Sequence, residues 1–111
     1  MSRYIDIMGV KYEILISSEK EDPILEENFG YHDPSIKRIV ISDMKTLAKD
    51  LDSFVDLDVY RDKILRHEII HAMLYESGLY DQSDFAMNEE LIDWIALQFH
   101  KLRKIFEEVD V

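Results

Sequence analysis

The stretch that most constrains this chain is His67-Glu68-Ile69-Ile70-His71, in which two histidines stand four residues apart and a glutamate follows the first. On an α-helix, residues i and i+4 lie on one face, one turn apart, so both imidazoles can reach a single metal ion. Apolar residues flank the stretch at helical spacing, and Ser77-Gly78 provides an end, because glycine suits the left-handed position after a helix. The sequence therefore predicts a helix that starts near Asp56 or Asp58 and carries two metal ligands.

Composition limits the ligands and partners that remain. The chain has 111 residues, no cysteine and a formal net charge of −11. A single domain over residues 1–111 is the expectation for this length. Without cysteine, a transition metal must be held by histidines and carboxylates. A chain this acidic is repelled by nucleic-acid phosphates, so no direct nucleic-acid binding is expected.

Hydropathy points to a chain that neither spans nor contacts a membrane. No apolar run approaches the roughly 18 residues that cross a bilayer. The first ten residues also lack the continuous apolar segment of a signal peptide. We therefore expect a cytoplasmic protein, with a monomer as the default oligomeric state.

Strand-like segments precede the histidine helix. Residues 3–16 are rich in β-branched and aromatic side chains, and Gly9 is expected to mark a turn or a bulge between two short strands. Residues 29–42 resemble a hairpin, with Ile36 to Ile41 as its clearest strand. Leucines at helical spacing predict a short helix over residues 43–55.

A second long helix is predicted over about residues 88–108, with Asn88 as its N-cap. Trp94 and the phenylalanines are expected in the core. Strands followed by two helices predict an α+β domain, in which a small N-terminal antiparallel or mixed sheet packs on two C-terminal helices.

A catalytic zinc site needs a third protein ligand. His100 is a poor candidate because it lies about 16 Å along the second helix from Glu89. Glu89 and Asp93 are four residues apart, so Glu89 can bind the metal while Asp93 hydrogen-bonds a ligand histidine. Glu90, about 100° round the helix, remains the alternative ligand, and an acid that favours the helix dipole remains the alternative role for Glu89.

His67-Glu68-x-x-His71, followed by Asn88-Glu89-x-x-x-Asp93, resembles the gluzincin metallopeptidases. The small size and the order of elements look more specifically like the ImmA/IrrE-type minimal gluzincins, which are common in phages, prophages and mobile elements. The motifs of this resemblance lie in the second half of the chain. The resemblance implies a zincin-like fold and Zn2+ held by His67, His71 and Glu89, with Asp93 supporting a ligand.

The same resemblance implies a hydrolase that cuts peptide bonds of a protein substrate, often a repressor or other regulator. Glu68 would act as general base on a metal-activated water. Ile36 to Ile41 or Phe29 to His32 would be the edge strand that receives the substrate. Tyr75, Tyr80 and His32 are candidate oxyanion donors, although such tyrosines more often pack in the core.

Two other readings stay open. The first is a non-catalytic binding or regulatory module of the same fold, in which zinc joins two helices. The second is a helical interaction protein without a metal. The substrate, its cleavage specificity and the host organism are not determined by the sequence.

Overall fold

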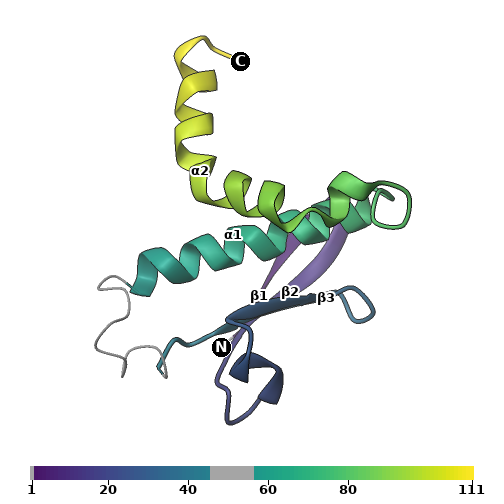
Figure 1. The fold of residues 1–111 in the computed structure, drawn as a ribbon, viewed down its shortest axis with the longest axis vertical. Helices are drawn as coiled ribbons and strands as arrows, with labels where there is room; N and C mark the ends of the chain where they lie inside the picture. The colour runs from purple at the N-terminus through teal and green to yellow at the C-terminus, as the bar shows by residue number, and fades with distance from the viewer. Residues whose placement is uncertain (1, 46–56) are drawn as a thin grey trace.

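The structure is a computed structural model that describes residues 2–45 and 57–111 (Figure 1). Its order of elements confirms the predicted α+β class, with all strands before both long helices. The elements are β1 (Ser2–Ile7), β2 (Val10–Ser17), η1 (Pro23–Glu26), β3 (Gly30–Asp33), β4 (Arg38–Ser42), α1 (Leu57–Glu76), η3 (Asp84–Met87) and α2 (Glu89–Glu108). The helix predicted over residues 43–55 falls largely outside the described residues.

The four strands form one mixed sheet in the order β1-β2-β4-β3. β1 pairs with β2 and β3 pairs with β4 in antiparallel fashion, whereas β2 and β4 run parallel. The turn predicted at Gly9 is confirmed: Met8 and Gly9 both have positive φ, at 54° and 87°, as a two-residue hairpin turn requires. β3 and β1 are therefore the two edges of the sheet.

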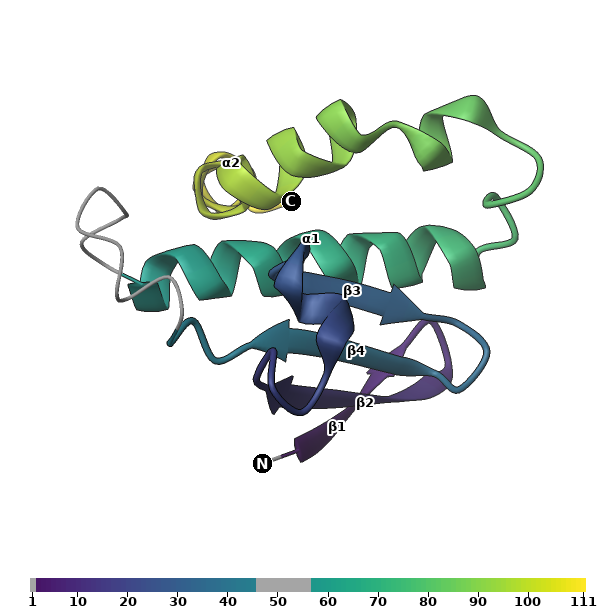
Figure 2. The ribbon, with the colours of Figure 1, turned by 60° about the horizontal axis from the view of Figure 1, so that its bottom comes forward.

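One face of the sheet packs against α1, and α2 lies on the other side of that helix, so the molecule has three layers (Figure 2). Alternation along the strands sends every second side chain toward α1. The buried core consists of Ile7, Tyr12, Ile14, Ile39, Ile41, Met44 and Ala72. Partly buried residues of α1, including Ile64 and Ile69, pack against it.

Both helix boundaries near the histidine motif follow from local chemistry. Gly78 has φ 78°, and its N–H donates to the Tyr75 carbonyl at 3.0 Å while the Leu79 N–H donates to Leu74 at 3.2 Å. These two bonds form a Schellman motif, which ends α1 where Ser77-Gly78 predicts it. The Asn88 side chain accepts from the Leu91 N–H at 2.9 Å, which confirms Asn88 as the N-cap of α2.

α2 contacts α1 through a narrow strip, in which Ile92 and Ala96 are the buried residues. Trp94 is 52% exposed, and Phe29, Phe85, Phe99 and Phe106 are exposed as well, so the expectation that these side chains lie in the core is wrong. Phe54 lies outside the described residues. Trp94 is exposed because it lies two residues from both Ile92 and Ala96 and therefore on the face of α2 away from α1. Phe99 and Phe106 are exposed because the second half of α2 turns away from α1 (Figure 1). None of the helices in the described part of the chain is long and apolar enough to cross a membrane.

Candidate metal centre

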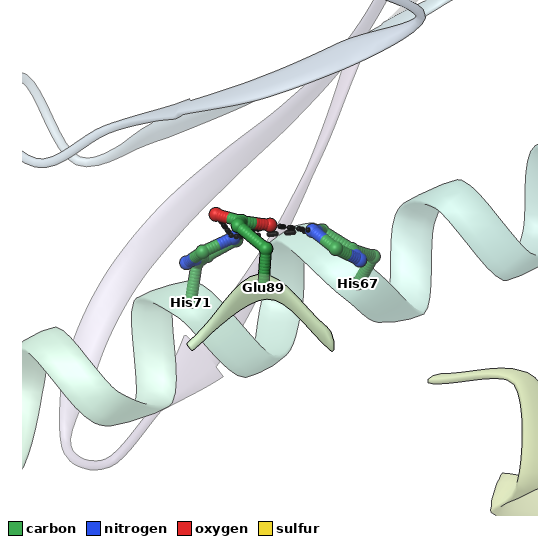
Figure 3. Close-up of side chains that lie close together, drawn as sticks. All are labelled: His67, His71 and Glu89. Atoms are coloured by element: carbon green, nitrogen blue, oxygen red, sulfur yellow. Dashed lines mark hydrogen bonds and ion pairs between the residues drawn. The ribbon is translucent and has the colours of Figure 1, made fainter. Parts of the chain in front are cut away.

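The two motif histidines point from α1 toward the start of α2, where Glu89 faces them (Figure 3). The helix places them one turn apart, with side chains only 15% and 17% exposed. Glu89 is the first residue of α2, directly after the Asn88 cap, so the cap that starts the helix also sets where this carboxylate stands. The three residues predicted as ligands thus come together from two elements.

The potential ligand atoms form a compact triangle. His67 Nε2 lies 2.8 Å from Glu89 Oε2, and His71 Nε2 lies 2.9 Å from Glu89 Oε1. The two Nε2 atoms are 3.2 Å apart. Within residues 2–45 and 57–111, His67, His71 and Glu89 are the group whose donor atoms all lie within 4.8 Å of one another, and Glu90 is not part of it.

These separations fit a tetrahedral zinc ion. Bonds of about 2.0 to 2.1 Å at tetrahedral angles place neighbouring ligand atoms about 3.3 Å apart, slightly wider than the observed triangle. The donor chemistry fits as well, because two imidazoles and a carboxylate are common zinc ligands. Burial lowers the pKa of His71, which favours the neutral imidazole that binds metal.

Asp93 stands behind His67, one helical turn after Glu89. Its Oδ1 is 3.3 Å from His67 Nδ1 and 2.5 Å from Lys63 Nζ. The hydrogen bond from Lys63 is the main reason why the pKa of Asp93 lies below its ordinary value. Asp93 is therefore placed to accept a proton from His67 Nδ1, which would leave the lone pair of His67 Nε2 facing Glu89. Lone pairs gathered in this way repel one another unless a cation or a proton lies between them.

Glu68 is the buried acid of the group, at 8% exposure. Burial raises the pKa of its carboxyl from 4.5 to about 7; the Glu89 carboxylate also raises it, and His67 acts in the opposite direction. Glu68 lines a cleft of about 400 Å³ together with both histidines and Glu89. A larger hollow of about 530 Å³ lies between the sheet and the first half of α1 and shares none of these residues.

A hydrogen-bonded network beside the cleft was not foreseen from the sequence. The fully buried Tyr12 hydroxyl donates to Glu76 Oε2 at 2.6 Å, and Lys37 Nζ donates to the same oxygen at 2.8 Å. His32 Nε2 lies 3.0 Å from the Tyr12 hydroxyl. Since that hydroxyl gives its proton to Glu76, His32 is the donor in this pair. Strand alternation identifies Tyr12 as a core residue, but no local signal links it to Glu76, which is 64 residues away.

Two of the three candidate oxyanion donors line the cleft, namely His32 and Tyr80. Tyr75 instead packs between them, with ring centroids 5.8 Å from His32 and 5.4 Å from Tyr80. Burial lowers the pKa of His32, with His71 as a further contributor. His100 lies beside Arg66, at 3.5 Å, and not in the His67 group.

The edge of the sheet beside the cleft is β3. The Ser42 N–H donates to the Phe29 carbonyl at 2.8 Å, which sets the alternation of the antiparallel ladder. Tyr31 and Asp33 then exchange backbone bonds with β4, while the backbone groups of Gly30 and His32 face the open edge. β4 is paired on both sides, so Ile36 to Ile41 provides no free edge, and of the two predicted edge segments only Phe29 to His32 lies at an edge of the sheet.

Comparison with known proteins adds no relative from which a role could be transferred. No protein-family profile, no curated protein and no solved structure matches this chain.

Proposed function

We propose that this chain is a zinc-dependent metallopeptidase of the minimal gluzincin type, with a zincin-like fold, acting on a protein substrate. The observation that carries the proposal is the triangle of His67, His71 and Glu89 beside the buried Glu68. A site that binds zinc only for structure has no use for a buried carboxylic acid next to its ligands, because burying an acid without a partner costs free energy. The placement of Asp93 behind His67 supports the same reading.

His67, His71 and Glu89 would hold the metal and leave one side open toward the cleft. Zinc bound there would polarise a water and the carbonyl of the scissile peptide bond. Glu68 would take a proton from the attacking water and deliver it to the leaving amine, because its carboxyl lines the same cleft. A pKa near 7 suits a group that must both accept and release a proton.

The substrate class follows from the edge strand. An extended peptide can pair with the free backbone groups of Gly30 and His32, as in β-strand addition. That placement would run the peptide along the cleft past the histidines. A protein segment that is unfolded or exposed is therefore the expected substrate, and the resemblance to phage-type proteins favours a regulator.

Zinc analysis combined with a Glu68→Gln variant tests this proposal. We expect the purified chain to carry about one zinc per molecule, measured by plasma mass spectrometry. We expect the native chain to cut an unfolded protein such as casein, measured by fragment mass spectrometry. Glu68→Gln should keep the zinc and lose the cleavage, and Glu90→Gln, at an exposed neighbour of the site, should keep both. A chain with no affinity for zinc would overturn the proposal.

A second function is favoured by one observation: the ligands come from both α1 and α2, so a bound ion would join the two helices. In that case the domain is a non-catalytic binding or regulatory module with a structural zinc. If the Glu68→Gln chain keeps every cellular effect of the native chain while His71→Ala unfolds it, this second function is the correct one.

A further inference from the structure

The second half of α2 leaves the body of the molecule at a bend (Figure 1). Arg66 of α1 lies there, with its Nε donating to the Ala96 carbonyl at 2.7 Å and its Nη1 3.5 Å from His100 Nε2. In a regular helix the Ala96 carbonyl accepts from the His100 N–H. A side chain that competes for this carbonyl is a recognised cause of helix bending. The projecting segment therefore begins beside a specific contact between α1 and α2.

The projecting segment carries an apolar stripe that is mostly exposed, with Leu102 as its part-buried member. The stripe consists of Phe99, Leu102, Ile105, Phe106 and Val109, which share one face at spacings of three and four. Every residue from 103 to 111 is exposed, and Ile105 is 57% exposed. A helical segment that packs on nothing gains no stability from its apolar side chains, so a partner that covers the stripe would stabilise it.

The charged residues beside the stripe favour a second copy of the same segment as that partner. The segment begins with Lys101, Arg103 and Lys104 and ends with Glu107, Glu108 and Asp110, so one end is basic and the other acidic. Lys101 and Glu108 are seven residues apart and lie on the same flank of the stripe. A surface with this order of charges is complementary to its own copy turned end for end.

We propose that the chain forms a homodimer in which residues 99–109 of two copies pack antiparallel, stripe against stripe. A two-fold axis near residues 104 and 105 brings Leu102 against the partner's Phe106 and Phe99 against the partner's Val109. The same axis places Lys101 beside the partner's Glu108, twice per dimer. A parallel arrangement would instead set the two basic turns at the same height, where like charges repel.

The interface is small, about 15 Å along the helix, so a dimer with a dissociation constant in the micromolar range is expected. The stripe shares no residue with the His67 group. A failed dimer test therefore leaves the proposed activity untouched, and a failed zinc test leaves the dimer untouched.

Sedimentation velocity of the full zinc-supplied chain, from about 5 to 300 μM, measures the association. We expect the native chain to shift from monomer to dimer within this range and Ile105→Asp to raise the dissociation constant at least about tenfold. Leu97→Asp is the matched control, because Leu97 is also 57% exposed but lies on another face of the helix than the stripe. Far-UV circular dichroism checks that each variant is folded. A native chain that stays monomeric at 300 μM, or a Leu97→Asp variant weakened as much as Ile105→Asp, overturns the proposal.

Charge reversal tests the antiparallel direction. Lys101→Glu and Glu108→Lys should each weaken the dimer about tenfold, because each places like charges together at two symmetric positions. The double variant Lys101→Glu/Glu108→Lys restores complementarity and should regain the native dissociation constant within about threefold. If the double variant is as weak as the single variants, the antiparallel arrangement is wrong.

Discussion

At the scale of single residues, burial decides how much a side-chain hydrogen bond contributes to stability. Tyr12 and Tyr4 sit on neighbouring strands and both carry hydroxyls that reach a carboxylate. Tyr12 is fully buried, whereas Tyr4 is 58% exposed. Only the buried hydroxyl has no water to replace a lost partner, so only its hydrogen bonds are expected to matter for stability.

Removing the Tyr12 hydroxyl should destabilise the chain. Tyr12→Phe breaks the bonds to Glu76 and His32 inside the protein, and we expect the free energy of unfolding to fall by about 1 to 3 kcal/mol. Urea titration followed by circular dichroism measures the change. Tyr4→Phe is the control and should shift the value by less than about 0.5 kcal/mol. Equal effects of the two variants would show that the Tyr12 network does not hold β2 to α1.

Glu68 is a buried acid, so its charge should weaken the metal-free fold. Its folded pKa of about 7 lies above the ordinary 4.5, so folding retains a proton between these values. The stability that Glu68 contributes is complete below pH 4.5 and is lost as the pH rises through 7, by about 3 kcal/mol in total. In the presence of a chelator, Glu68→Gln should therefore stabilise the chain at pH 8.

The measurement compares urea unfolding of the two chains at pH 5 and pH 8. The gain from Glu68→Gln should be large at pH 8 and small at pH 5. The same gain at both pH values would contradict the burial of an ionisable Glu68, because an uncharged effect does not depend on pH.

At the scale of elements, β3 approaches α1 closely at Gly30, which has no side chain to keep the two apart. A Cβ on Gly30 would lie 2.8 Å from Ile64 Cγ2 and 2.9 Å from Ile41 Cδ1. This close approach brings the edge strand and the histidine helix together along the same cleft. The distance between β3 and the candidate metal centre therefore depends on Gly30.

Gly30→Ala should push β3 away from α1 and cost about 1 to 3 kcal/mol of stability, the usual effect of overpacking. Ile64→Ala removes the nearer of the two contacts, so the double variant should be less destabilised than the sum of the two single variants. A double-mutant cycle in urea measures this coupling. Strict additivity would mean that β3 and α1 are not in the contact described.

For the whole molecule, the candidate metal centre lies between the second and third of its three layers. α1 packs against the sheet through a broad core, but α2 contacts α1 only through a narrow strip around Ile92 and Ala96. A metal held by α1 histidines and an α2 carboxylate would add a strong tie at the weaker of the two boundaries. Metal loading is therefore expected to change global stability.

Zinc should raise the thermal midpoint of the native chain. At a hundredfold excess over the dissociation constant the ion contributes about 2.7 kcal/mol, which corresponds to a rise on the order of 10 °C for a chain of this size. Glu89→Gln should lose most of this rise, whereas Glu90→Gln should keep it, because only Glu89 faces the histidines. Calorimetry with and without zinc makes the comparison. If Glu90→Gln loses the rise and Glu89→Gln keeps it, then Glu90 is the third ligand and the prediction for Glu89 is wrong.

The sequence by itself determined the features that depend on a few neighbouring residues. Helical spacing places His67 and His71 on one face, Gly78 ends α1, Asn88 starts α2, and Gly9 turns the first hairpin. Each of these follows from backbone geometry and hydrogen bonds within about one helical turn or one hairpin turn, so no distant contact is needed. The order of strands and helices was sufficient for the α+β class.

Only the tertiary structure decided which distant groups meet. Glu89 rather than Glu90 faces the two histidines, and β3 rather than β4 lies at an edge of the sheet. Glu76 lies within hydrogen-bond distance of the Tyr12 hydroxyl. It also left Trp94 and the apolar stripe of α2 exposed, although their hydropathy alone predicts a core. The physical reason is that burial and charge pairing depend on how whole elements pack. Trp94 lies on the face of α2 away from α1, and the second half of α2 leaves α1 at a bend beside the contact between Arg66 and the Ala96 carbonyl.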